Sequence, residues 1–142
     1  MKPKPYFRSL VIVFILLFLT ACENPLKEEQ KKERVLIFFD EYVRETGRYI
    51  LYWDGKDENR NYVDPGRYIV LLEIKDWQDQ EYIVVQDGGK AGKNNQSRFE
   101  PGYWLSNDLE VPFPDTFRVA SGTNIPFVLS GPNPVTISIY KD

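Results

Sequence analysis

Histidine is absent from this 142-residue sequence, and cysteine occurs once. Without histidine there is no imidazole general base, no Ser-His-Asp triad and no histidine metal ligand. A single cysteine excludes an internal disulfide and a zinc site built from several thiolates. The chain also lacks a Gly-x-Ser-x-Gly nucleophile elbow. We therefore expect a protein that is not an enzyme and that needs no cofactor.

The first 21 residues have the pattern of a secretory signal peptide. Three basic residues precede an uninterrupted apolar run over residues 10–19, and the small pair Thr20-Ala21 follows the run. A membrane-spanning helix needs about 20 apolar residues, which is more than this run supplies. The segment therefore predicts export followed by removal of the leader, not a permanent membrane span.

Leu19-Thr20-Ala21-Cys22 resembles the lipobox of bacterial lipoproteins. In that family the cysteine sulfur receives a diacylglycerol, the preceding peptide bond is cut and the new amine is acylated. The resemblance implies that Cys22 is lipidated and that acyl chains hold the mature protein on a membrane. Glu23 follows in place of the aspartate that retains lipoproteins in the inner membrane of enteric bacteria, which favours the outer membrane, facing the periplasm. The alternatives are a buried structural cysteine or an ordinary signal peptide with a coincidental cysteine.

The mature chain is predicted to be acidic. Removal of residues 1–21 leaves 15 basic against 21 acidic side chains, a balance of −6. A negative body argues against nucleic acid as a partner and against electrostatic binding to anionic lipid head groups. We expect the lipid anchor to make the membrane contact, and an envelope protein or a glycan to be the further partner.

Residues 22–34 are predicted to form a lipidated tether. From Glu23 to Arg34 the chain is polar, charged or proline except for Leu26, so it cannot build a core. It is either extended or a short helix that begins at Asn24-Pro25. In both cases it separates the anchor from the domain that follows.

Residues 35–142 have the size and composition of one all-β domain. Aromatic and β-branched runs alternate with Gly, Pro, Asn and Asp, and prolines are frequent between residues 100 and 135. An Ig-like or fibronectin III-like β-sandwich of about seven strands is the predicted fold. Residues 35–43 also fit one face of a helix, but the apolar run 36–39 favours a buried strand. The candidate strands are residues 35–39, 48–53, 67–75, 81–86, 116–120, 127–130 and 135–139.

Residues 53–59 read Trp-Asp-Gly-Lys-Asp-Glu-Asn, and Val63 and Gly66-Arg67-Tyr68 follow. This strand–turn–strand pattern resembles the Ig-like domain of flagellar hook-capping proteins and related secreted bacterial modules. The resemblance covers about a third of the domain and implies an assembly or adhesion element without catalytic residues. Trp53 and Tyr68 would then cap the core. Arg60 stands where that family has the turn glycine, so a differently shaped loop tip is expected.

Aromatic side chains are the candidates for a binding face. Trp77, Tyr103 and Trp104 could stack on the apolar faces of sugars, which would make the domain a carbohydrate- or cell-wall-binding module. The alternative is structural: Trp77 packs over a hairpin turn near Asp76, and Tyr103-Trp104 closes one end of the core. Aromatic residues make up 15% of the chain, so most of them must serve the fold.

The loop from Asp54 to Asp64 is rich in oxygen ligands. Its spacing imitates the opening of an EF-hand, but the sixth position is Tyr62 and the twelfth is Tyr68, so the bidentate closing glutamate is absent. A hydrated turn is therefore favoured over a metal site. The weak metal-ligand candidates are Asp54, Asp57, Asn59, Asn61 and Asp64.

A glycine-rich segment, residues 87–97, only superficially resembles a phosphate-binding loop. A P-loop would need glycine at position 87 and a hydroxyl at position 94, where the chain has Asp87 and Asn94. We expect a mobile hairpin or linker there instead.

Overall fold

The computed structural model describes residues 32–142. The predicted signal peptide, the lipidation site Cys22 and most of the tether lie outside these residues. The described part of the chain is all-β. None of its segments is a helix long and apolar enough to cross a membrane.

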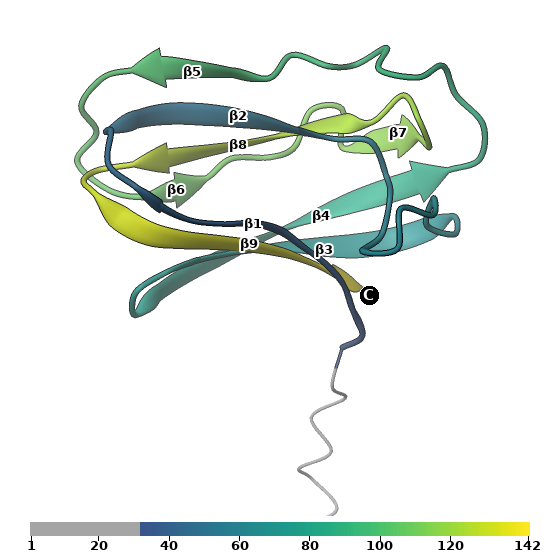
Figure 1. The fold of residues 1–142 in the computed structure, drawn as a ribbon, viewed down its shortest axis with the longest axis horizontal. Coiled ribbons are helices and arrows are strands. Elements are labelled where there is room, and N and C mark those ends of the chain that lie inside the picture. Colours follow the sequence, from purple (N-terminus) through teal and green to yellow (C-terminus); the bar gives the residue numbers. More distant parts are fainter. Residues whose placement is uncertain (1–31) are drawn as a thin grey trace, which may run out of the picture. The chain divides into compact units, whose positions relative to one another are not determined.

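Nine strands form two sheets that pack face to face as an Ig-like sandwich (Figure 1). The five-stranded sheet has the order β1-β9-β3-β4-β7, and the four-stranded sheet has the order β5-β2-β8-β6. All neighbours are antiparallel except β4 and β7, which run parallel. The strands are β1 (Arg34–Val43), β2 (Gly47–Trp53), β3 (Gly66–Ile74), β4 (Trp77–Gln86), β5 (Arg98–Pro101), β6 (Asp108–Leu109), β7 (Thr116–Arg118), β8 (Thr123–Leu129) and β9 (Asn133–Lys141).

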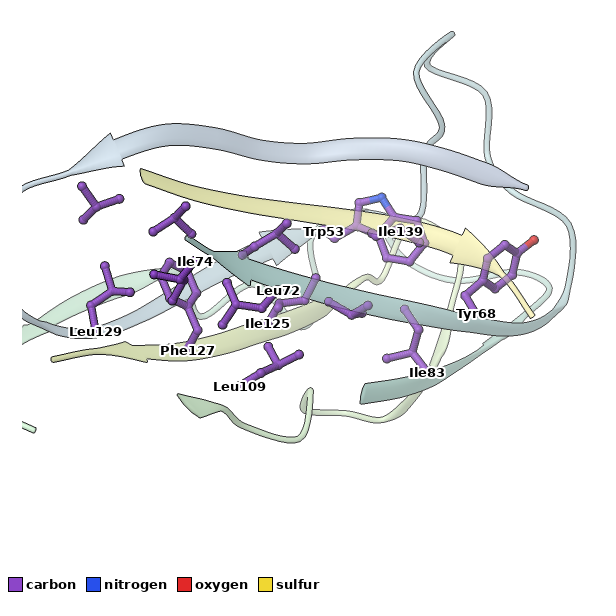
Figure 2. Packing of buried hydrophobic residues seen from close by; sticks show 14 of the residues in the cluster. Trp53, Tyr68, Leu72, Ile74, Ile83, Leu109, Ile125, Phe127, Leu129 and Ile139 are labelled. Carbon is purple, nitrogen blue, oxygen red and sulfur yellow. The ribbon is translucent and has the colours of Figure 1, made fainter. Parts of the chain in front are cut away.

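The core lies between the sheets and is filled by alternate residues of the long strands (Figure 2). Leu72 of β3 belongs to one sheet, whereas Ile125 and Phe127 of β8 belong to the other, and all three are fully buried. Each such side chain is worth about 1.5–3 kcal/mol when it leaves water. This burial stabilises the long strands, in which every second side chain faces the core.

Trp53 and Tyr68 belong to the core, as the sequence predicts, although they come from opposite sheets. Their rings meet edge to face with centroids 6.4 Å apart, and Phe117 contacts Trp53 in the same way at 5.6 Å. The Trp53 indole N–H donates to the carbonyl of Lys56 at 2.9 Å, so its one polar atom is satisfied. The three rings close the sandwich at this end.

All seven predicted strands are confirmed, and two further strands were missed. β4 begins at Trp77, four residues before its predicted start, and β8 begins at Thr123, also four residues early. The missed strands, β5 and β6, contain four and two residues. Such short segments carry no readable alternation, because pairing with β2 and β8 creates them.

β1 is a strand, not the alternative helix, and its irregular pattern has a structural cause. Register shifts occur between Arg34 and Leu36 and again between Ile37 and Phe39, where β1 pairs with β9. These bulges let adjacent apolar residues, such as Phe38 and Phe39, both pack on the core. Pairs of neighbouring inward residues imitate a helical period, which explains the ambiguity of the sequence.

The sandwich has two distinct ends. At the proximal end the described chain starts beside its last residues, since Arg34 pairs with Tyr140 and the Lys32 ammonium lies 3.9 Å from the Asp142 carboxylate. At the distal end β1 turns into β2, β3 turns into β4, β5 leads toward β6 and β8 turns into β9 (Figure 1). The loops that could meet a partner are therefore divided between opposite ends of one domain.

Candidate binding site

The distal end carries the most exposed aromatic and aliphatic side chains of the described chain. Tyr103 is 96% exposed, and Leu105 is fully exposed, in the loop that joins β5 to β6. Folding normally removes side chains of this kind from water, and a display of both on one loop tip is typical of a contact surface. This tip is one wall of the candidate site.

Trp104, between these two residues, has a different role. Its ring lies against Gly102, where an added Cβ would come within 2.6 Å of a ring carbon. Trp104 is only half-buried. Glycine at position 102 thus lets the indole fold back onto its own loop, while Tyr103 and Leu105 extend into solvent.

Phe99 of β5 forms the floor of the site and is held from two sides. Its ring packs on Tyr49 of β2 at a tilt of 36° with centroids 4.6 Å apart, and Tyr49 stacks in turn on the buried Phe127 at 5.1 Å. A Cβ at Gly47 would come within 2.6 Å of the Phe99 ring and 2.5 Å of the Glu100 carbonyl oxygen. Glycine at the start of β2 is therefore required for this close approach.

The loop between β1 and β2 forms the opposite wall and is fixed by Tyr49. The Tyr49 hydroxyl donates a 2.6 Å hydrogen bond to the carbonyl of Glu45. Burial, and secondarily the nearby Glu45 carboxylate, raises the pKa of Tyr49, so this hydroxyl keeps its proton at neutral pH. The same tyrosine thus supports the floor and one wall.

These parts enclose an open hollow of about 330 Å³, which we call the distal hollow. Glu45 is the one ionisable acid among its lining residues, and Thr46 adds a hydroxyl. The lining consists of Glu45, Thr46, Phe99, Pro101, Gly102 and Tyr103. Aromatic rings beside a carboxylate and hydroxyl groups suit a ligand with both an apolar face and hydrogen-bonding groups.

The structure separates the three aromatic residues that the sequence nominated. Tyr103 lines the distal hollow and Trp104 supports the same loop. Trp77 is half-buried against the core at the start of β4, paired with Ile74, so the structural interpretation of Trp77 holds. Sequence reasoning missed Phe99, Glu45 and Thr46, because the pairing of β2 with β5 that unites them has no sequence signal.

An ion network borders the distal hollow without entering it. Arg48 donates to Glu110 at 2.5 Å and to Glu100 at 3.3 Å. Arg98 also donates to Glu100, and this bond is the chief reason that the pKa of Glu100 is lowered. The bond to Glu110 is likewise the main cause of the raised pKa of Arg48. Glu100 is thus paired within the protein, while Glu45 faces the hollow.

The oxygen-rich loop at the proximal end uses its oxygens internally. One carboxylate oxygen of Asp57 accepts hydrogen bonds from the backbone N–H groups of Asn59 and Asn61, both at 2.9 Å. Arg60 between them has a φ of 64°, so the tip has the left-handed backbone that glycine adopts. The expectation that the loop tip differs in shape from that family's stays a prediction.

Two further ligand candidates of this loop also form internal contacts, Asp54 through its carboxylate and Asp64 through its backbone carbonyl. Asp54 accepts from the backbone N–H of Lys56 at 3.1 Å and pairs with its ammonium at 3.6 Å. The carbonyl of Asp64 accepts a 2.7 Å hydrogen bond from the Tyr68 hydroxyl. Within residues 32–142, no group of three acidic or cysteine side chains is arranged to hold a metal ion. The loop is built as a self-bonded turn.

The segment from residue 87 to residue 97 is fastened to the sandwich, contrary to the mobile loop that the sequence predicts. The buried Asn124 accepts from the backbone N–H of Gln96 at 2.8 Å and donates to the carbonyls of Asn94 and Phe113. Ser121 accepts from the backbone N–H of Lys90 at 3.0 Å. The segment crosses from one sheet to the other, and Asn124 is the residue that holds it.

The comparisons with known proteins found no matching family model, no matching curated protein and no matching solved structure. The likeness of residues 53–68 to the Ig-like domain of hook-capping proteins therefore stays a prediction. Functional inference therefore rests on the residues of this chain, and the distal hollow is the surface feature that brings its exposed aromatic side chains together with polar groups.

Proposed function

We propose that the protein is a lipid-anchored cell-envelope protein whose sandwich is a non-catalytic binding or scaffolding module. The observation that carries the proposal is the separation of the two ends. The described chain starts at the proximal end, whereas the exposed Tyr103 and Leu105 lie at the distal end. An anchor attached upstream of Lys32 therefore leaves the distal hollow free to meet a partner.

The length of the tether fits this arrangement. Nine residues lie between Cys22 and Lys32, and the ten residue-to-residue steps reach at most about 35 Å when the chain is extended. The sandwich would stay close to the membrane and search only the adjacent layer of the envelope. Confinement of this kind raises the effective concentration of the module near its partner without any new contact.

The composition of the distal hollow supports binding over catalysis. General acid–base chemistry of the glycosidase type needs two carboxyl groups across one cleft. Glu45 is the one carboxylate among the residues that line this hollow. Its neighbours are aromatic rings, a hydroxyl, a proline and a glycine, which can hold a ligand but supply no second proton-transfer group.

The resemblance to the Ig-like domain of hook-capping proteins supports the same class of role. Trp53 and Tyr68 occupy the core, and Arg60 has a left-handed φ, as glycine readily adopts. An assembly or adhesion module in that family has no catalytic residues. The lipobox and the small size favour an envelope protein over a flagellar one.

Replacement of Cys22 tests the anchor. We expect Cys22→Ala to move the protein from the membrane pellet to the soluble fraction, because the only cysteine of the chain is removed. Tyr103→Ala, at the distal end, is the matched control and should remain in the pellet. Mass spectrometry of the native protein should find a lipidated amino-terminal Cys22; an unmodified thiol would refute the anchor. Density-gradient separation of the membranes then tests the outer-membrane assignment.

Site-specific crosslinking tests the orientation of the module. A photoreactive residue at Leu105 should capture an envelope partner, whereas one at Tyr62, which is 46% exposed at the proximal end, should not. Equal capture from the two positions would contradict a partner-facing distal end.

A further inference from the structure

We propose that the distal hollow is a subsite for a neutral sugar residue of a glycan, an inference that rests on the binding role proposed above. Sugars combine apolar C–H faces with a rim of hydroxyl groups, and binding requires a ring surface beside hydrogen-bonding groups. The hollow offers Tyr103 and Phe99 as ring surfaces, and Glu45 and Thr46 as polar groups. Its volume of about 330 Å³ lies at the lower end of the range for small-molecule sites, which suits a ligand of monosaccharide size.

The parts of the subsite are held in place by the fold. Phe99 is fixed between Gly47 and Tyr49, and the Tyr49 hydroxyl fixes the backbone at Glu45. Trp104 packs on Gly102 and so supports the turn from which Tyr103 projects. A site whose walls are already fixed loses less conformational entropy on binding.

The charge of the hollow selects among glycans. Glu45 is its one ionisable acid, and the neighbouring Glu100 is neutralised by Arg48 and Arg98. No lysine or arginine is among the residues that line the hollow. A carboxylated or sulfated sugar would be repelled by the Glu45 carboxylate, which has no ion-pair partner among residues 32–142, whereas neutral hydroxyl or acetamido groups can donate hydrogen bonds to it.

The same chemistry disfavours a proline-rich peptide, which also binds to aromatic grooves. Such a peptide presents backbone carbonyls, which are acceptors, and its prolines lack N–H donors. Glu45 can only accept while it is ionised, so a polyproline segment would leave its carboxylate without a partner. Sugar hydroxyls satisfy both Glu45 and Thr46.

The mature lipidated protein in detergent micelles should be screened on an array of neutral and acidic oligosaccharides. Saturation-transfer NMR and calorimetry on the neutral tetrasaccharides of glucose and of N-acetylglucosamine then give affinities. We expect saturable binding of a neutral glycan and no binding of tetragalacturonate. Tyr103→Ala should weaken binding about tenfold or more. Glu45→Gln should weaken it less and reduce the discrimination against the acidic probe.

The matched control is Tyr62→Ala, which removes an exposed ring at the proximal end and should bind as the wild type does. Circular dichroism verifies that each variant is folded. A flat response to the whole neutral panel overturns the sugar assignment, as does unchanged affinity in Tyr103→Ala or binding of a proline-rich peptide in place of a glycan. None of these outcomes affects the lipid anchor, which fractionation of Cys22→Ala tests separately.

Discussion

The proximal and distal ends of the sandwich use aromatic side chains in opposite ways. At the proximal end Trp53, Tyr68 and Phe117 meet edge to face and are almost fully buried. At the distal end Tyr103 extends into water, and Phe99 is still 36% exposed although it packs on Tyr49. The contrast indicates that aromatic rings stabilise the core at the proximal end, whereas the exposed ring of Tyr103 contributes little to it.

Replacement of Trp53 should give the largest loss of stability. Trp53→Ala removes a side chain that is 2% exposed and leaves a cavity beside Tyr68 and Phe117, so the free energy of unfolding should fall by about 3–5 kcal/mol. Urea unfolding followed by circular dichroism measures the change. A shift below about 1 kcal/mol would show that Trp53 is not part of the core. Trp77→Ala is the control: it truncates a half-buried indole at the distal end and should cost less.

Replacement of Asn124 should cause the second-largest loss of stability, because its side chain joins three segments by hydrogen bonds near the proximal end. Asn124→Ala leaves the N–H of Gln96 without its partner and removes the donor to the Asn94 and Phe113 carbonyls. We expect a loss of about 2–3 kcal/mol. Hydrogen exchange should become faster from residue 88 to residue 97 in the variant. If residues 88–97 exchange at the same rate in the wild type and in the variant, Asn124 does not hold this segment.

Replacement of Glu81, in the middle of β4, should change the free energy of unfolding less, and should increase it. Burial chiefly, and then the carboxylates of Asp79 and Asp108, raise the pKa of Glu81 in the folded protein. A raised pKa means that the protonated form is favoured by folding, so stability falls as pH rises through the folded-state pKa. Glu81→Gln should therefore stabilise the protein at pH 7 by under about 1 kcal/mol. Thermal unfolding at about pH 3.5, below the ordinary pKa of glutamate, should show little of that gain.

Tyr103→Ala should have the smallest effect on stability. The side chain is 96% exposed, so its removal should change the free energy of unfolding by no more than about 0.5 kcal/mol. The same variant is expected to lose glycan affinity, which separates recognition from folding. A measurable loss of stability would contradict the difference between the two ends, because it would show that Tyr103 stabilises the fold.

The fold was largely readable from the sequence, because the long strands carry their burial pattern in alternation. β9 is the clearest case: Val135, Ile137 and Ile139 are fully buried on one face. β6 was unreadable, since only two residues pair there and the signal lies in β8. The strand–turn–strand pattern after Trp53 was also readable, and Gly55 in this turn adopts a φ of 89°.

The candidate site was predicted only in part. The sequence does not show the direction of each side chain or which residues distant in the chain lie together. Tyr103 and Trp104 are adjacent in the chain, yet one is exposed and the other half-buried, because the contact of the indole with Gly102 decides their directions. Glu45 and Phe99 are far apart in sequence and meet only through the pairing of β2 with β5. Composition alone could nominate aromatic residues, but it could not show which of them line one hollow.

The neighbouring positions of Lys32 and Asp142 have a practical consequence for labelling the molecule. A fluorophore or affinity tag attached after Asp142 would leave the sandwich beside Lys32, where the described chain begins. Immobilisation through such a tag would present Tyr103 and Leu105 to the solution, as the membrane is proposed to do. A sensor surface prepared in this way would therefore leave the distal hollow accessible to dissolved ligands.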